Sequence, residues 1–329
     1  MADHAVDDNN DDGDIFIYRG GRAPQHITHA RIDESVDEIE DNAFEYCRRL
    51  VKVETHDGIR KIGKGTFYYC ESLRWMNLKS VVEIGRNAFT RCKNLETVEF
   101  GDRLETIGHS AFIGCTSIKH LKLPSIITMR GFAFSECTGI TDVEFSERLE
   151  TIEELCFYCC EHLQRIAIPL KRDLFTVGLL YSPDDDDQRY DEFDGCEQLT
   201  AVDLVGGIHK TVASLHMESW RTEMNTKINQ INQDLPNTPV SEKTDEIKRW
   251  MDSVIDKMDH YKSEHYRYVK EGITLLELAL WKFKLGEKEE YAAEGKRKKA
   301  KVESARKEGR ITCGADIVIK NVLPFLQLE

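Results

Sequence analysis

The chain has no long apolar run, and this absence argues against a membrane-spanning helix. Nowhere in its 329 residues do about 18 apolar residues occur together. Residues Met1 to Asp14 hold six Asp and no apolar stretch of the kind that forms a secretory leader. We therefore expect an intracellular protein, cytoplasmic or nuclear, with no membrane partner.

Basic residues are in the minority. The 45 Lys and Arg against 59 Asp and Glu give a formal net charge of −14, which argues against a protein that binds nucleic acid over its whole surface. Hydrophobic residues make up 40% of the chain, enough to bury a core, and charged residues make up 32%. The length allows about two domains.

Motifs of catalysis and metal binding are also missing. The sequence contains no H-E-x-x-H, no G-x-S-x-G, no Walker-type loop and no dinucleotide-binding glycine pattern. His260 and His265 are five residues apart, whereas two zinc ligands on one helix face need a spacing of four. We predict a non-enzymatic protein with no catalytic residue, no metal and no cofactor.

What the sequence does contain is a repeat, a Phe followed three residues later by a Cys. The spacings between successive cysteines are 23, 22, 23, 22, 23 and 36 residues, so the unit recurs too regularly for chance. The seven pairs are Phe44/Cys47, Phe67/Cys70, Phe89/Cys92, Phe112/Cys115, Phe134/Cys137, Phe157/Cys160 and Phe193/Cys196.

Each unit also places apolar residues three, six and usually eight positions after its Cys, as in Ile118, Leu121 and Leu123. Apolar residues at every second position near the end of the unit predict a short strand whose alternate side chains point inward. One unit of 22 or 23 residues cannot bury its own apolar face, so the units must stack. The pattern predicts an α/β solenoid of seven parallel-stranded repeats, with Phe112 inside a central one.

The segments Leu95-Glu-Thr-Val-Glu-Phe100, Leu104-Glu-Thr-Ile-Gly-His-Ser-Ala-Phe-Ile-Gly-Cys115 and Ile118-Lys-His-Leu-Lys-Leu-Pro124 resemble BspA-type leucine-rich repeats. The resemblance covers about residues 27 to 205. It implies a leucine-rich-repeat scaffold used in protein or surface recognition, and it carries over no catalytic residue.

The outward strand positions, five and seven residues after each Cys, should line one face of the stack. We expect this face to be concave and to bind a protein partner, because aromatic and cationic side chains on it resemble interface anchors. The predicted partner-binding residues are Trp75, Asn77, Glu99, His120, Lys122, Glu144 and Arg165. An ordinary solvated face is the alternative.

One Cys per unit at one phase predicts a ladder of buried structural thiols rather than a metal site, which needs paired ligands. The exception is Cys156-Phe-Tyr-Cys159-Cys160, where Cys159 is additional to the repeat. A thiol-redox or metal function for Cys156, Cys159 and Cys160 is therefore an alternative hypothesis.

After about Gly207 the repeat stops and helical spacing begins. Apolar residues at intervals of three or four predict one helix that ends before Pro236 and one or two more that start at Pro239 and end near Gly286, packed as a hairpin or small bundle. We expect these helices to cap the open end of the solenoid, with an oligomerisation surface as the alternative.

The remaining segments complete the predicted domain plan. Residues Lys296 to Arg310 are rich in Lys and Arg, beginning Lys296, Arg297, Lys298, Lys299 and Lys301. This tract predicts an import signal with an import receptor as partner, or phosphate contacts in a nuclear nucleic-acid-associated regulator. The plan reads 1–14 acidic disordered tail, 15–207 solenoid with an acidic loop at about 182–192, 208–285 helical cap, 286–312 charged linker and 313–329 docking segment.

Overall fold

The computed structural model describes residues 15–176, 191–215 and 217–294, with side chains as far as residue 284. The chain forms two compact units, Met1–Met258 and Asp259–Glu329. Every strand belongs to the first unit, and the longest helix begins in the first unit and continues in the second. Within the described residues, none of the helices combines the length and the apolar character needed to cross a membrane.

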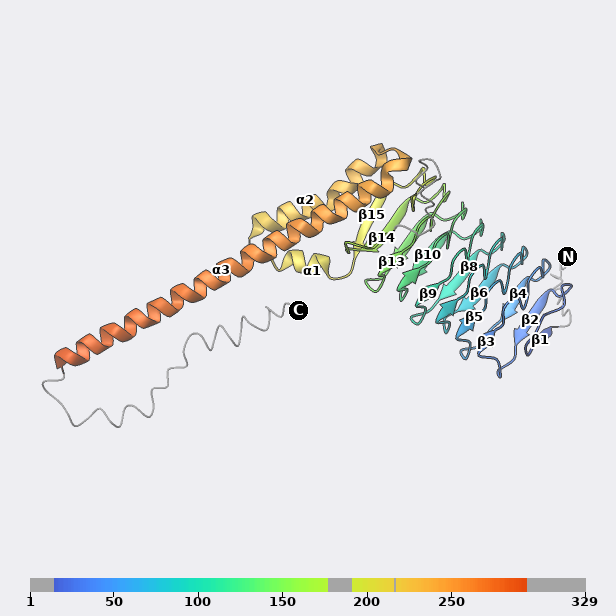
Figure 1. The fold of residues 1–329 in the computed structure, drawn as a ribbon, viewed down its shortest axis with the longest axis horizontal. Helices are drawn as coiled ribbons and strands as arrows, with labels where there is room; N and C mark the ends of the chain where they lie inside the picture. The colour runs from blue at the N-terminus through green and yellow to red at the C-terminus, as the bar shows by residue number, and fades with distance from the viewer. Residues whose placement is uncertain (1–14, 177–190, 216, 295–329) are drawn as a thin grey trace, which may run out of the picture. The chain divides into compact units, whose positions relative to one another are not determined.

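The first unit is a stack of parallel strands, as the period-2 pattern predicts (Figure 1). The strands that follow the cysteines, together with two strands ahead of Cys47, form a ladder in two sheets. One sheet contains β1 (Phe16–Tyr18), β2 (His29–Ile32), β4 (Lys52–Glu54), β6 (Trp75–Leu78) and β8 (Thr97–Phe100). The other contains β10 (His120–Leu123), β12 (Asp142–Phe145), β14 (Arg165–Pro169) and β15 (Ala201–Val205).

We call each repeat unit of the stack a rung. A second set of strands, each only two residues long, runs along the side of the rungs opposite the ladder. These six strands form one unbroken parallel sheet. In chain order they are β3 (Glu38–Ile39), β5 (Lys61–Ile62), β7 (Glu83–Ile84), β9 (Thr106–Ile107), β11 (Thr128–Met129) and β13 (Thr151–Ile152).

The repeated phenylalanines form a continuous column inside the stack. From Phe44 to Phe193 each ring stacks on the next, with centroids 4.8–6.1 Å apart and planes within 17° of parallel. Tyr18 continues the column at its N-terminal end, with its ring tilted against that of Phe44. All these rings are buried, which confirms the interior position predicted for Phe112.

The turn that carries each Phe has a fixed backbone conformation. In most rungs the residues two before and two after the Phe have a positive φ, for example Asn42 and Tyr46 around Phe44. Glycine is the residue that best tolerates this left-handed region, and it stands there at Gly65, Gly114 and Gly195. Elsewhere larger residues take the same conformation.

The ladder is interrupted once, between β8 and β10, where the two sheets end. Val98 and Phe100 on β8 are partly exposed, although the apolar pattern predicts that both lie inside. The short-stranded sheet and the phenylalanine column continue past this point, since β7 pairs with β9 and Phe89 stacks on Phe112 at 4.8 Å. The stack is therefore held together here by its interior and its second sheet.

Helices follow the last rung. They are α1 (Ile208–Ala213), α2 (Glu218–Asp234) and α3 (Lys243–Glu294), with short 3-10 turns at Leu235–Asn237 and Val240–Glu242. The prediction that the second helix starts at Pro239 was wrong, because Pro239 precedes a separate 3-10 turn and α3 begins at Lys243. The predicted end near Gly286 was also wrong, since α3 continues to Glu294 and Gly286 lies within it.

The start of α3 contacts the last rung through buried polar groups. The Lys243 ammonium donates hydrogen bonds to the backbone carbonyls of Cys196, Glu197 and Leu199 at 2.8–3.0 Å. On the neighbouring residue, the Thr244 hydroxyl accepts a hydrogen bond from the Phe193 amide at 3.3 Å. These contacts satisfy carbonyl groups that the terminal rung cannot pair with a further repeat.

Candidate protein-binding surface

The seven predicted partner-binding residues all lie on ladder strands. Strand pairing places Trp75 beside Thr97 and Asn77 beside Glu99 in one sheet. In the other sheet it aligns His120 with Asp142 and Lys122 with Glu144, and Arg165 continues the first of these rows. We call the outward side chains of these strands the ladder face. Because β8 and β10 are not paired, the ladder face consists of two adjoining parts.

Charges on the ladder face are largely paired across neighbouring strands. Lys122 lies 3.3 Å from Glu144. Arg165 bridges two carboxylates, with Nη1 3.0 Å from Asp142 and Nε 2.6 Å from Asp203. The hydrogen bond to Asp142 is the largest cause that raises the pKa of Arg165. The guanidinium of Arg165 is therefore engaged within the face itself.

The aromatic and imidazole anchors are accessible. Trp75 and Asn77 are half-buried, and His120 and Lys122 are exposed. The backbone beneath them is held by parallel ladder pairing on the strands that carry them. A rigid backbone with accessible Trp, His and Lys side chains presents a surface of fixed geometry.

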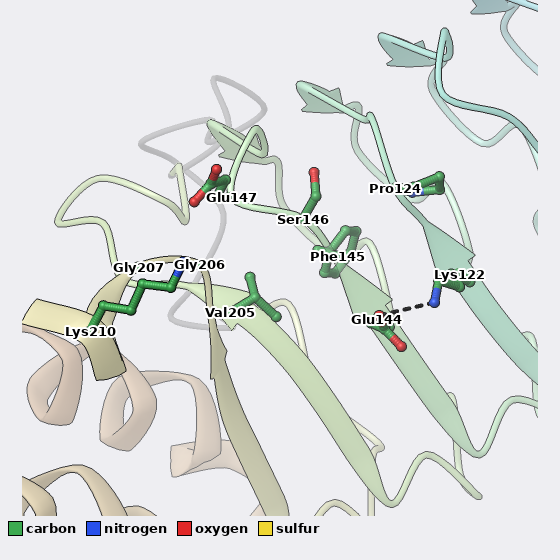
Figure 2. Close-up of a pocket in the computed structure, with 10 residues that line it drawn as sticks. All are labelled: Lys122, Pro124, Glu144, Phe145, Ser146, Glu147, Val205, Gly206, Gly207 and Lys210. Atoms are coloured by element: carbon green, nitrogen blue, oxygen red, sulfur yellow. Dashed lines mark ion pairs between the residues drawn. The ribbon is translucent and has the colours of Figure 1, made fainter. Parts of the chain in front are cut away.

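A groove of about 460 Å³ opens where the second ladder sheet meets α1 (Figure 2). Lys122 and Glu144 line it from β10 and β12, together with Ser146 and Glu147 from the turn after β12. The opposite wall is formed by Val205, Gly206, Gly207 and Lys210, while Pro124 and Phe145 complete the lining.

Gly206 has a structural reason to lack a side chain. Its φ is +89°, and a Cβ there would lie 2.9 Å from a carboxylate oxygen of Glu147. The glycine thus lets the chain leave β15 close to the turn after β12. The repeat pattern predicted Lys122 and Glu144 but not this wall, because Gly206, Gly207 and Lys210 lie outside the repeat.

The repeated thiols are structural. From Cys70 onward each ladder thiol donates to the backbone carbonyl of the Phe one rung earlier, at 3.0–3.2 Å. Burial raises the pKa of Cys47 to about 11 and that of Cys196 to about 12. Because the thiolate is the nucleophile, thiols held in the protonated form are unreactive.

The structure does not bring Cys156, Cys159 and Cys160 together as a metal site. No group of three or more His, Cys, Asp or Glu side chains in the described part of the chain could hold a metal ion. The Cys156 thiol donates to the Arg130 carbonyl at 3.1 Å and the Cys160 thiol to the Phe134 carbonyl at 3.2 Å. Burial raises the pKa of both. Only Cys159 is partly exposed.

Several predicted segments lie outside the described residues. These are the acidic tail 1–14, nearly all of the acidic loop at 182–192, the basic tract from Lys296 to Arg310 and the docking segment 313–329. Of the linker predicted at 286–312, only the part to residue 294 is described, as helix.

The second unit has a different surface. Its helical residues include exposed large apolar side chains, among them Leu275 at 67%, Trp281 at 69% and Phe283 at 63%. Such side chains on a helix are available to pack against another element.

A family model for the BspA type leucine rich repeat region matches this chain in six copies, over residues 23–131 and 60–178. The solenoid belongs to the BspA-type leucine-rich repeat family. The matched residues end before Phe193, but the seventh unit continues the BspA-type stack, because β15 pairs with β14 and Phe193 stacks on Phe157.

Solved structures similar to this solenoid are leucine-rich repeat proteins. A cell surface protein from Faecalibacterium prausnitzii is 20% identical, with a TM-score of 0.36, over 55% of this chain and 62% of its own. A T. pallidum leucine-rich repeat protein is also 20% identical, with a TM-score of 0.36, over 62% of this chain and 88% of its own.

A Bacteroides ovatus leucine-rich repeat protein is 23% identical, with a TM-score of 0.34, over 58% of this chain and 69% of its own. The match to the Faecalibacterium prausnitzii protein spans less than two thirds of the length of that protein. A search of curated proteins finds no match.

Proposed function

We propose that this protein recognises a protein partner through the ladder face and makes or breaks no covalent bond in doing so. The observation that carries the proposal is the strand register, which sets Trp75, His120 and Lys122 at fixed outward positions on the ladder face, with Lys122 also lining the groove. Leucine-rich repeat solenoids are typical of protein recognition, which agrees with this use of the surface.

The groove supports a site for an extended or loop segment of the partner. It combines two lysines, two glutamates and an apolar part formed by Pro124, Phe145 and Val205. Apolar contact with Trp75 would supply most of the affinity, because tryptophans are enriched among the residues whose loss weakens interfaces. Lys122 and Lys210 would orient acidic groups of the partner.

Affinity capture followed by direct binding tests the proposal. The intact chain is compared with a variant carrying Trp75→Ala, His120→Ala and Lys122→Ala. Arg165 is left unchanged, since its removal would leave Asp142 and Asp203 without their shared cation. A captured protein is then purified, and its Kd is measured against both chains.

The matched control carries Lys64→Ala, Arg86→Ala and Lys93→Ala, three exposed residues outside the ladder strands. In the variant with Trp75→Ala, His120→Ala and Lys122→Ala, called the ladder variant, we expect Kd to rise at least about tenfold, or about 1.4 kcal/mol. We expect Kd to be unchanged in the control. Equal affinity of both variants for every captured protein would move the binding activity away from the ladder face.

A further inference from the structure

Three tyrosine rings gather on the turns of the first two rungs, away from the ladder strands. The Tyr68 and Tyr69 centroids are 4.7 Å apart, and the Tyr46 centroid lies 5.5 Å from each of them. The guanidinium carbon of Arg48 lies 5.9 Å from the centroids of both Tyr46 and Tyr69. We call these four residues the tyrosine cluster.

The backbone that carries the tyrosine cluster is held by rung hydrogen bonds. The Tyr46 amide donates to the Tyr68 carbonyl at 2.8 Å, and the Tyr69 amide donates to the Thr90 carbonyl at 2.8 Å. The Arg48 amide donates to the Tyr46 carbonyl at 2.7 Å. Tyr46 is 40% exposed and Tyr68 and Tyr69 are half-buried, so this held backbone presents the three rings at the surface. A pre-organised surface loses little conformational freedom on binding.

No acidic side chain among the described residues pairs with the positive charge of the cluster. Arg48 and Arg49 are exposed, and neither forms an ion pair with any residue in the described ranges. The nearest acidic neighbour in sequence, Glu45, is paired with Arg22 at 3.1 Å. One rung further along, by contrast, Arg91 is paired with Glu136 at 2.8 Å. Within the part of the chain that the structure describes, Arg48 is thus a cation beside the aromatic rings with no carboxylate paired to it.

The turn does not need these rings. Tyr46 and Tyr69 stand two residues after a repeated Phe, at φ of 60° and 59°, where other rungs place Gly114 and Gly195. A residue with a Cβ is less favourable than glycine in this backbone region. The chain thus holds an exposed Tyr46 and a half-buried Tyr69 at positions that the fold can fill with glycine.

We propose that the tyrosine cluster is a docking site for an acidic segment of a partner protein. A carboxylate of that segment pairs with the guanidinium of Arg48, which can present two N–H groups side by side. The three rings pack against apolar side chains that flank the carboxylate, since Tyr and Arg are the residues that most often anchor protein interfaces. This site is separate from the ladder face and does not depend on the proposed function of that face.

Peptide selection on the intact chain tests this proposal. A random 12-residue display library is the probe, and selected peptides are synthesised with a fluorophore for polarisation measurements of Kd. We expect selected sequences to carry Asp or Glu next to apolar or aromatic residues. Two variants remove the cluster independently, Arg48→Gln and the pair Tyr46→Gly with Tyr69→Gly. Glycine accepts the φ values of these turns, so the second variant should fold.

Cys159→Gly is the matched control, because Cys159 occupies the same turn position near the other end of the stack, at φ 55°. We expect Kd to rise at least tenfold in both cluster variants and to stay constant in Cys159→Gly and in the ladder variant. Selected peptides without acidic residues, or with unchanged Kd in both cluster variants, would overturn the proposal. So would binding of heparin that requires Arg48 when no acidic peptide binds.

Discussion

At the scale of single residues, Phe and Cys have complementary roles in each rung. The ring stacks on its neighbouring rings, while the thiol donates to a backbone carbonyl of the preceding rung, that of Pro24 for Cys47 and that of the preceding Phe from Cys70 onward. The first contact is dispersion and apolar burial, and the second satisfies a buried carbonyl. Together they explain why both residues recur in all seven units.

Truncation of a central ring should be costly. Phe112 lies between Phe89 at 4.8 Å and Phe134 at 4.9 Å and is fully buried. Phe112→Ala is therefore expected to lower the free energy of unfolding by about 3–5 kcal/mol. Urea unfolding measures this change, with the exposed Lys119→Ala as control. A cost below about 1 kcal/mol would contradict the column.

The ladder thiols should make stability fall at alkaline pH. Burial raises the pKa of Cys47 from 9.0 to about 11, so the unfolded chain loses this proton first. A group whose folded pKa is raised contributes stability that is complete below pH 9 and is lost as the pH rises toward 11.

We expect Cys47→Ala to lose less stability than the parent chain between these two pH values, by about 2–3 kcal/mol. Urea unfolding at a series of pH values gives the comparison. The other alkaline titrations are common to both chains and cancel. Parallel pH curves for the two chains would contradict a protonated buried thiol at this position.

At the scale of elements, Lys243 connects α3 to the last rung. Burial lowers the pKa of its ammonium, while three backbone carbonyls accept hydrogen bonds from it. Lys243→Met fills similar volume but removes this donor from all three carbonyls, of which that of Cys196 keeps the Leu199 amide at 3.3 Å, and we expect it to cost about 2–4 kcal/mol. Chemical unfolding tests this, and Lys262→Met, on an exposed part of α3, is the control. A neutral Lys243→Met would mean that the carbonyls find other donors.

Turn geometry gives a second prediction at this scale. Gly114 has a φ of +70°, and an added Cβ would lie 2.9 Å from the Arg91 side chain. That side chain can move, so the backbone conformation sets most of the cost. We expect Gly114→Ala to lower the free energy of unfolding by about 1–2 kcal/mol. The control is Gly207→Ala, where a Cβ meets nothing within 4 Å. Equal melting temperatures for the two variants would contradict this expectation.

The elements also show where sequence reasoning ends. The period of Phe and Cys predicted the parallel strands, the buried column and the thiol ladder, because each depends on one repeating local pattern. The interruption between β8 and β10 could not be predicted, since Val98 and Phe100 fit the pattern as well as Leu121 and Leu123 do. The wall of the groove depends on the path of the chain after β15, which no periodic signal specifies.

At the scale of the whole molecule, each rung contacts mainly its two neighbours, so a local defect should spread only a short distance. We expect Lys243→Met to speed amide hydrogen exchange in residues 193–205 and to leave residues 38–54 unchanged. Hydrogen exchange of the full chain, measured by mass spectrometry, distinguishes this local opening from unfolding of the whole stack in one step. Equal acceleration in both segments would show that the solenoid opens as a single cooperative unit.

The wide spacing of 36 residues between Cys160 and Cys196 has a practical consequence. The extra chain leaves the stack undisturbed, since Phe157 and Phe193 are still 5.9 Å apart and the Cys196 thiol still reaches the Phe157 carbonyl at 3.1 Å. The geometry of a rung is thus set by its ring and thiol contacts with the neighbouring rung, and it does not depend on the number of residues between the two units. The two flanking rungs would therefore be expected to keep these contacts if the chain between them were lengthened further, so that a fluorescent tag or a foreign epitope could be inserted between these two units.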